Sequence, residues 1–181
     1  MSEKLPDREE ALQFLRESGC KENVVRHCEA VAELASEMVE ACKRRGLDVD
    51  SELVEIGALL HDIGRSKTHS VHHAVEGARV AESLGLPESI VSIIKRHVGG
   101  GISAEEAKKL GWPRDVYVPQ TLEEKIVSYA DKLVEGAKRV PMEKTMAKFS
   151  EKERLPISAI ARMHRLHEEM MTLIGDCEWQ P

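Results

Sequence analysis

The stretch Ala58-Leu59-Leu60-His61-Asp62-Ile63-Gly64-Arg65 decides how the rest of this chain can be interpreted. An apolar run that begins at Ile56 leads directly into a His-Asp pair, and Gly64 then ends it. An imidazole beside a carboxylate at a buried helix end is costly unless something binds both groups. A divalent metal ion would be such a partner. The alternative is an interior histidine followed by an aspartate that caps the next segment, and two residues alone do not separate these interpretations.

The composition predicts one helical domain. The chain has 181 residues, of which 41% are hydrophobic, enough for a single domain with a substantial core. Aromatic residues make up only 3%, so the core must consist of Ala, Leu, Ile, Val and Met, a mixture that favours helices over sheets. The formal net charge is -6, without a dense basic block, which argues against a nucleic-acid polymer as partner.

The cysteines and the chain start favour a cytoplasmic protein without membrane contact. The four cysteines, Cys20, Cys28, Cys42 and Cys177, form no Cys-x-x-Cys pair, so we expect reduced thiols rather than a zinc site. The first ten residues are charged from the start, unlike a signal peptide. The longest apolar run is far too short to span a bilayer.

Capping residues, glycines and prolines divide the chain into helices. The expected helices cover 8–18, 23–45, 51–62, 71–84, a segment from Pro87, 103–111, 121–140, a segment between Pro141 and Pro156, and 157–174, with a polar loop at 64–70. Strand alternation, repeats and long linkers are not evident. We therefore expect an all-α, single-domain helical bundle over 1–181, with a metal-binding core at about 23–140. The extension 141–181 either covers this core or forms a subunit contact in a homo-oligomer.

The strongest signal is a set of polar residues on the apolar sides of separate helices. His27 lies three residues after Val24, and Asp131 lies four residues after Val127, so both face inward with those residues. The full set is His27, His61, Asp62, His73, His97 and Asp131. One such residue is usually a satisfied core histidine, but five independent placements, with the pair His61-Asp62 counted once, are hard to attribute to chance. Helical bundles build metal sites in this way, from side chains on facing helices.

This set resembles the signature of the HD superfamily of metal-dependent phosphohydrolases, which has a His, then a His-Asp pair, then a distant Asp. Ile63 and Gly64 complete the form of the motif called HDIG, and the resemblance runs from about Val24 to Gly136. His73, rather than His72, matches the His-x-x-x-Gly-Ala segment of members that hold two metals. The resemblance implies an all-α fold and a hydrolase.

Carried over to this chain, the resemblance also implies a ligand set. A first metal would be bound by His27, His61, Asp62 and Asp131, and Asp62 would bridge to a second metal bound by His73 and His97. Nitrogen and oxygen ligands without thiolate suit Mn, Fe, Co, Ni or Zn. Two such metals can hold a bridging hydroxide that attacks phosphorus.

Several cations are candidates for substrate phosphate. Arg65 stands where many relatives have Lys, and we expect it, with Asp62, to act in catalysis and, with Lys67, to bind substrate. For Lys95 and Arg96 we favour solvated surface charges. Arg26 could support His27 or bind phosphate.

Other residues keep open roles. His69 and His72 could act as supporting groups, substrate contacts or extra ligands. His164 and His167 lie outside the resemblance, and we expect them to be structural or on the surface. Segment 101–120 is expected near the mouth of the pocket, where Trp112 and Tyr117 could stack a base, although packing is the favoured role.

The expected function is a dinuclear metal phosphohydrolase that cleaves a phosphoester or phosphoanhydride bond of a small phosphorylated molecule, with a nucleotide favoured. Among relatives, the pattern looks closest to hydrolases that split diadenosine tetraphosphate symmetrically. A cyclic-nucleotide phosphodiesterase like the HD-GYP group is less favoured, because the Gly-Tyr-Pro triplet is missing. Two further alternatives remain: a non-catalytic metal- or nucleotide-binding module, and a di-iron oxygenase with the same six ligands.

Overall fold

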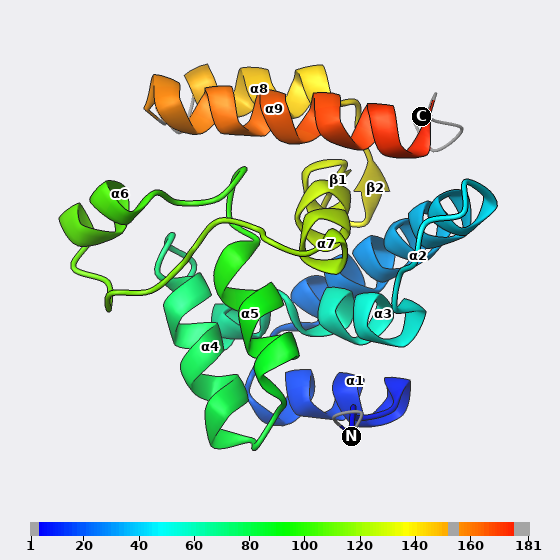
Figure 1. Cartoon of the computed structure of the whole chain (residues 1–181). Helices are drawn as coiled ribbons and strands as arrows, with labels where there is room; N and C mark the ends of the chain where they lie inside the picture. Colours follow the sequence, from blue (N-terminus) through cyan, green and yellow to red (C-terminus); the bar gives the residue numbers. More distant parts are fainter. Residues whose placement is uncertain (1–3, 152–155, 176–181) are drawn as a thin grey trace.

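The computed structural model describes residues 4–151 and 156–175, and in these residues the expected all-α fold is confirmed (Figure 1). The elements are α1 (Arg8–Glu17), α2 (Glu22–Arg44), α3 (Ser51–Leu60), the 3₁₀ turn η1 (Ile63–Ser66), α4 (His73–Ser83), α5 (Glu88–Arg96), α6 (Ala104–Lys109), α7 (Leu122–Lys132), β1 (Val134–Glu135), β2 (Lys138–Arg139), α8 (Met142–Glu151) and α9 (Ile157–Ile174). Within the described part of the chain, none of the helices combines the length and hydropathy that a bilayer span requires.

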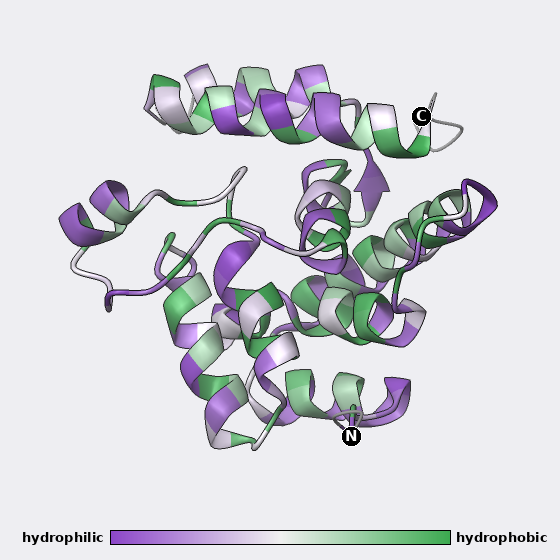
Figure 2. Cartoon of the chain, in the orientation of Figure 1, coloured by the Kyte–Doolittle hydropathy of each residue, from purple (hydrophilic) through white to green (hydrophobic). Residues whose placement is uncertain are grey.

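The centre of the bundle is α3, which packs against α2, α5 and α7. From Val54 to Leu60 most of its side chains are buried, and Figure 2 shows the helix coloured as hydrophobic over most of its length. Its N-terminus is capped by Asp50, whose carboxylate accepts a hydrogen bond from the backbone of Leu53 at 3.0 Å. A short apolar helix thus runs through the core and delivers His61 and Asp62 at its C-terminal end.

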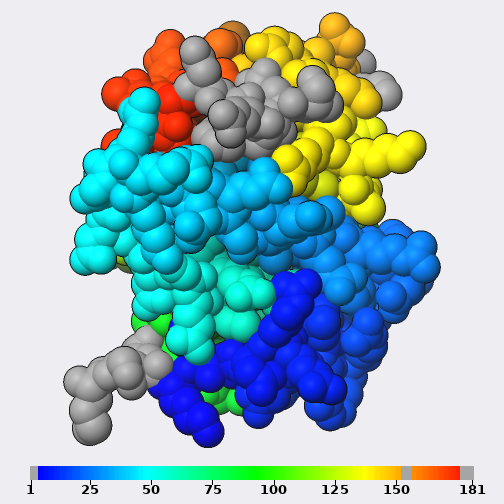
Figure 3. Space-filling model, turned by 90° about the vertical axis from the view of Figure 1, so that its right-hand side faces the viewer, coloured from blue at the N-terminus to red at the C-terminus, as the bar shows by residue number. Residues whose placement is uncertain are grey.

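The other helices surround α3 (Figure 1). The pair α4 and α5 packs together on one side, α1 packs below α3, and α8 and α9 form a layer above α7. Figure 3 shows α2 running across a neighbouring face, between the N-terminal helix below and the C-terminal helices above. The C-terminal helices therefore cover the core, which is one of the two roles expected for them.

The glycines at 99–101 allow α9 to pack closely on the rest of the domain. A Cβ atom on Gly100 would lie 2.6 Å from the backbone nitrogen of Met163 in α9, so only glycine allows this approach. Beside it, the guanidinium of Arg162 donates a hydrogen bond to the carbonyl of Gly101 at 2.9 Å and pairs with Glu106. The triplet thus does more than interrupt the chain, because it lets α9 lie directly on the loop that follows α5.

One helix boundary was predicted wrongly. The helix expected over 121–140 ends at Lys132, and an antiparallel hairpin follows, with Val134 paired with Arg139 and Glu135 with Lys138. Gly136 has a φ of 61°, the left-handed conformation that a tight turn needs. Strands of two residues are too short to show any alternation in the sequence, which is why the helical pattern was extended through them.

Candidate metal centre

Four histidine side chains are each held by a contact between Nδ1 and a backbone carbonyl. The Nδ1 atoms of His27, His61, His73 and His97 lie 2.8, 2.6, 2.7 and 2.6 Å from the carbonyl oxygens of Gly136, Ala58, Ser70 and Ile94, respectively. In three of the four cases the carbonyl belongs to the residue three positions earlier, at a helix end or turn where such groups lack helical partners. Because a carbonyl only accepts, each Nδ1 carries the proton, and in the neutral ring each Nε2 presents a lone pair.

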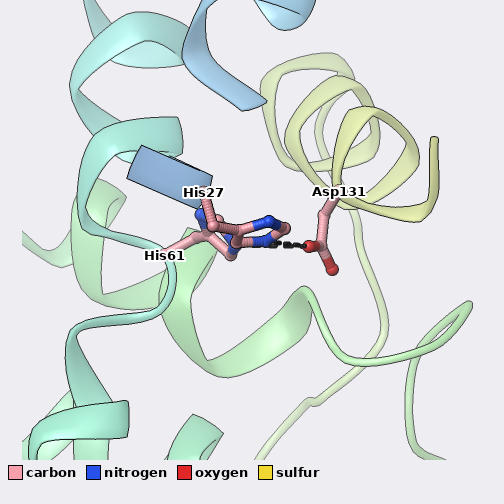
Figure 4. Close-up of side chains that lie close together, drawn as sticks. All are labelled: His27, His61 and Asp131. Atoms are coloured by element: carbon pink, nitrogen blue, oxygen red, sulfur yellow. Dashed lines mark hydrogen bonds and ion pairs between the residues drawn. The ribbon is translucent and has the colours of Figure 1, made fainter. Parts of the chain in front are cut away.

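On one side of the centre, the Nε2 atoms of two of these histidines lie beside Asp131. The Oδ1 atom of Asp131 lies 3.0 Å from Nε2 of His27 and 3.3 Å from Nε2 of His61 (Figure 4). The three side chains come from α2, the end of α3 and α7, as the spacing of the sequence predicts. Both Nε2 atoms also lie 3.8 Å from Oδ2 of Asp62.

On the other side, the remaining oxygen of Asp62 faces the second pair of histidines. Its Oδ1 atom lies 3.2 Å from Nε2 of His73 and 3.4 Å from Nε2 of His97. Asp62 is only 6% exposed, at the start of the turn η1. One carboxylate therefore stands between two pairs of imidazoles and directs one oxygen to each pair.

The donor set fits divalent metal ions. The groups His27–His61–Asp131 and His61–Asp62–His97 each have ligand atoms within 4.8 Å of one another. The Nε2 atoms of His73 and His97 lie 3.0 Å apart, although both rings have their protons on the other nitrogen. Two lone pairs at this distance repel unless a proton or a metal ion lies between them. The Nε2 atom of His61 is buried and has no hydrogen-bond partner among the described residues. A cation would satisfy all of these atoms.

Both carboxylates are ionised at neutral pH. Burial would raise the pKa of Asp62, but the neighbouring imidazoles, His61 first and then His73 and His97, lower this pKa well below its usual range. For Asp131, burial is likewise outweighed by the charge of Lys132 and the hydrogen bond with His27, which lower its pKa well below normal. The site thus keeps two negative charges for a cation.

The histidines differ between the two sides. Burial lowers the pKa of His97 to about 4, so this ring is neutral and its Nε2 is available as a ligand. Burial would also lower the pKa of His27, but the hydrogen bond and charge of Asp131 outweigh burial and raise it. Only the neutral imidazole can bind a metal ion, so metal binding at His27 must displace a proton that Asp131 favours.

Lys132 belongs to the site, and the sequence interpretation missed it. It is only 4% exposed and lines the cavity beside the metal centre. Its ammonium group donates to Oδ2 of Asp131 and, at 3.1 Å, to the carbonyl of His97. Oδ1 of Asp131 thus remains available to His27 and His61. Because Lys132 contacts both Asp131 and His97, it connects the two sides of the centre. A lysine next to the last aspartate was the available signal, but helical spacing directs adjacent residues to different faces.

The cavity at the centre has a volume of about 460 Å³, in the range of small-molecule pockets. Arg65 lines it, with Nε 3.4 Å from both oxygens of Asp62 and Nη1 2.6 Å from the carbonyl of His69. Lys67 is exposed and is not among the residues that line the cavity. The structure therefore brings one of the two predicted substrate cations to the centre.

The surface interpretation of Lys95 and Arg96 is wrong. Lys95 is only 8% exposed, and its ammonium lies 2.8 Å from a carboxylate oxygen of Asp115. Arg96 is paired at 2.8 Å with the buried carboxylate of Glu124. Both cations thus fasten α5 to the following segments, away from the cavity. Arg26 is exposed and lines a separate surface groove along α2.

The remaining candidates have mostly structural roles. The packing role of Trp112 and Tyr117 is confirmed, because both are buried in a small second hydrophobic cluster. The Nε1 atom of Trp112 donates to Nδ1 of His72 at 2.8 Å. His167 hydrogen-bonds to the hydroxyl of Tyr129 at 2.8 Å, whereas His164 is exposed. Of segment 101–120, only Gly101 and Ile102 line the cavity. His69, from the loop before α4, also lines it.

The three cysteines that the structure describes take no part in the ligand set. Cys20, Cys28 and Cys42 are buried free thiols, and Cys177 lies outside the described residues. Burial raises the pKa of the Cys20 thiol to about 11, and it raises that of Cys28 as well. Thiols in this state are poor metal ligands and poor nucleophiles.

The chain is similar to several known proteins. The family model described as HD domain matches residues 24–136. An uncharacterised protein of Methanocaldococcus jannaschii is 46% identical over 166 residues, which cover 92% of this chain and 98% of that protein. A tRNA (cytidine(56)-2'-O)-methyltransferase of Picrophilus torridus is 39% identical over 171 residues, which are 94% of this chain but 48% of the methyltransferase. The present chain thus spans about half the length of that relative.

A solved structure shares the fold. The HD domain of the L. monocytogenes phosphodiesterase PgpH, in complex with cyclic-di-AMP, has a TM-score of 0.52 and 19% sequence identity to this chain. The match covers 93% of this chain and 98% of the PgpH domain. At this identity the likeness concerns the fold alone.

Proposed function

This chain belongs to the HD-domain family, and from that premise we propose that it is a metal-dependent phosphohydrolase of small phosphorylated molecules, with a nucleotide favoured as substrate. The observation that carries the proposal is the position of Asp62, whose two oxygens face two different pairs of histidines. A carboxylate in this position is suited to bridge two metal ions. The cavity beside it has the size of a small molecule rather than of a polymer.

The ligand roles in this proposal follow the distances. His27, His61 and Asp131 would hold one ion, His73 and His97 the other, and Asp62 would bind both. The chemistry that paired divalent ions supply is a water that ionises near neutral pH and a positive field for phosphoryl oxygens. The carbonyls that hold each Nδ1 fix the ring orientation and the tautomer, as supporting groups do in other metal sites.

Arg65 and Lys132 would then act on the carboxylates and on the substrate. Arg65 donates from Nε toward both oxygens of Asp62, which keeps that group oriented between its histidines. Because Arg65 also lines the cavity, its guanidinium lies where a phosphate oxygen could accept from it. Asp62 and Arg65 are therefore the proposed catalytic residues, and the remaining ligands hold the metal.

Metal content and phosphate release together test this proposal. The protein, purified without chelator, should contain close to two transition-metal ions per chain by mass spectrometry. It should hydrolyse some members of a panel of nucleotides and phosphodiesters in the presence of Mn or Fe, and a chelator should abolish the activity reversibly. Bound metal without hydrolysis of any member would overturn the hydrolase and favour the binding module. Iron with substrate-dependent oxygen consumption would favour the oxygenase instead.

Replacing Lys132 with methionine should weaken metal binding without unfolding the chain. The methionine keeps most of the volume but removes the donor to Oδ2 of Asp131 and one of the two donors to the carbonyl of His97, which Ser128 still contacts. Loss of a group that orients a ligand typically lowers metal affinity by about 10- to 100-fold. Calorimetric titration with Mn²⁺ measures this change. Lys125 in the same helix pairs with Glu169 away from the cavity, so its methionine variant is the matched control. Equal affinities of the two variants would contradict the role of Lys132.

A further inference from the structure

One wall of the cavity lies outside the residues that the HD family model matches. That model ends at residue 136, whereas α8 begins at Met142. Three residues of α8 line the cavity, namely Thr145, Lys148 and Phe149. Their spacing of three and four residues places them along one side of the helix. The ligand set is thus typical of the family, while this wall belongs to the C-terminal part of the chain.

The charges in the cavity give Lys148 a particular position. Two of the lining cations are already engaged, since Arg65 contacts Asp62 and Lys132 contacts Asp131. Lys148 is half-buried, and no ion pair or hydrogen bond to its ammonium is found within residues 4–151 and 156–175. A half-buried cation that has no partner in the described part of the chain gains most from an anionic group that enters the cavity.

Phe149 adds an aromatic surface next to that cation. It is partly buried against the main core and also lines the cavity. The lining also includes the apolar residues Val71, Val98 and Ile102. A flat ring beside such residues replaces water at apolar surface, and aromatic side chains bind bases by stacking without regard to sequence.

We propose that α8 is the specificity wall of this site, where Phe149 packs against the base of a nucleotide and Lys148 binds one of its phosphate oxygens. The inference rests on the proposed function for the presence of a phosphate-binding centre, but it concerns selection rather than chemistry. It predicts that the chain prefers a phosphate compound that carries a base over the same compound without one.

The test compares the binding of adenosine 5′-monophosphate with that of ribose 5-phosphate to the metal-loaded protein by calorimetry. Base stacking on an aromatic side chain contributes about tenfold in affinity. We expect that preference in the wild type, and we expect Phe149→Leu to reduce it to near one. Phe14→Leu is the matched control, because Phe14 packs against the same core from α1 and does not line the cavity. A ratio near one in the wild type, or an unchanged ratio in Phe149→Leu, would overturn the role of Phe149.

The cation is tested separately. Lys148→Gln should lower the affinity for both compounds by about tenfold, because both carry the phosphate and the variant loses a charged hydrogen bond to it. Lys144→Gln is the control on the same helix, since Lys144 is exposed and does not line the cavity. Unchanged binding of ribose 5-phosphate in Lys148→Gln would overturn this half of the proposal. These binding affinities do not depend on turnover. The binding predictions can therefore be wrong while metal-dependent hydrolysis is observed, and they can be right while hydrolysis is absent.

Discussion

Replacing Asp62 with alanine is expected to remove bound metal from both sides of the centre and to reduce phosphoester hydrolysis by more than about 100-fold. A loss of about 100-fold is the upper limit for groups that only orient a ligand. A larger loss is expected here because Asp62 is proposed to be the ligand shared by both ions. Without it, the Nε2 atoms of His73 and His97 still lie 3.0 Å apart but lose the carboxylate oxygen that faces them. Metal analysis of the purified variant, together with hydrolysis rates, measures both effects.

Two further variants make the Asp62 result specific. Asp62→Asn keeps the shape and one oxygen but removes the negative charge, so it should retain the fold while binding metal weakly. Asp115→Ala removes another ion-paired aspartate, which lies 2.8 Å from Lys95 and outside the cavity, and it should retain metal and activity. If Asp62→Ala retained two ions per chain, the bridging role would be wrong.

The proximity of the residues proposed as metal ligands could be predicted because their positions depend on local spacing. His27 and Asp131 are fixed by neighbours three and four residues away, and the periodicity of a helix carries that information in the sequence. The same logic failed for Lys132, since a residue next to Asp131 falls on a different face of α7. Its long side chain reaches back to the carbonyl of His97, and periodicity does not describe such reach.

Contacts between distant segments could not be predicted in this way. No motif marks Lys148 or Phe149, and their place at the cavity results from how α8 and α9 pack over α7. Lys95 shows the same limit, because its ammonium pairs with Asp115, which lies in a loop twenty residues later. Local patterns therefore indicated which histidines and aspartates come together, whereas the packing of helices determined the cavity around them.

The second large effect is expected at Gly64, the glycine that follows the His-Asp pair. Gly64 packs directly against the start of α4, and a Cβ atom there would lie 1.8 Å from the carbonyl oxygen of His73 and 2.6 Å from the backbone nitrogen of Gly77. Backbone atoms cannot rotate away as a side chain can. Gly64→Ala should therefore push α4 outward and lower the free energy of unfolding by about 3 kcal/mol or more, at the upper end for overpacked cores. Denaturant unfolding measures this loss.

Gly57 provides the matched comparison, because it is also a buried glycine with a close neighbour. A Cβ atom on Gly57 would lie 2.4 Å from Cδ1 of Ile93, the end of a side chain that can change its rotamer. The helix also gains about 1 kcal/mol when alanine replaces an interior glycine, so Gly57→Ala should be near neutral. Because Gly64 lies against the backbone of His73, its alanine variant should also displace His73 and lose metal from the His73–His97 side first. Equal stabilities of the two alanine variants would show that α4 can move away at little cost, and that the glycine after His-Asp is not required for the position of His73.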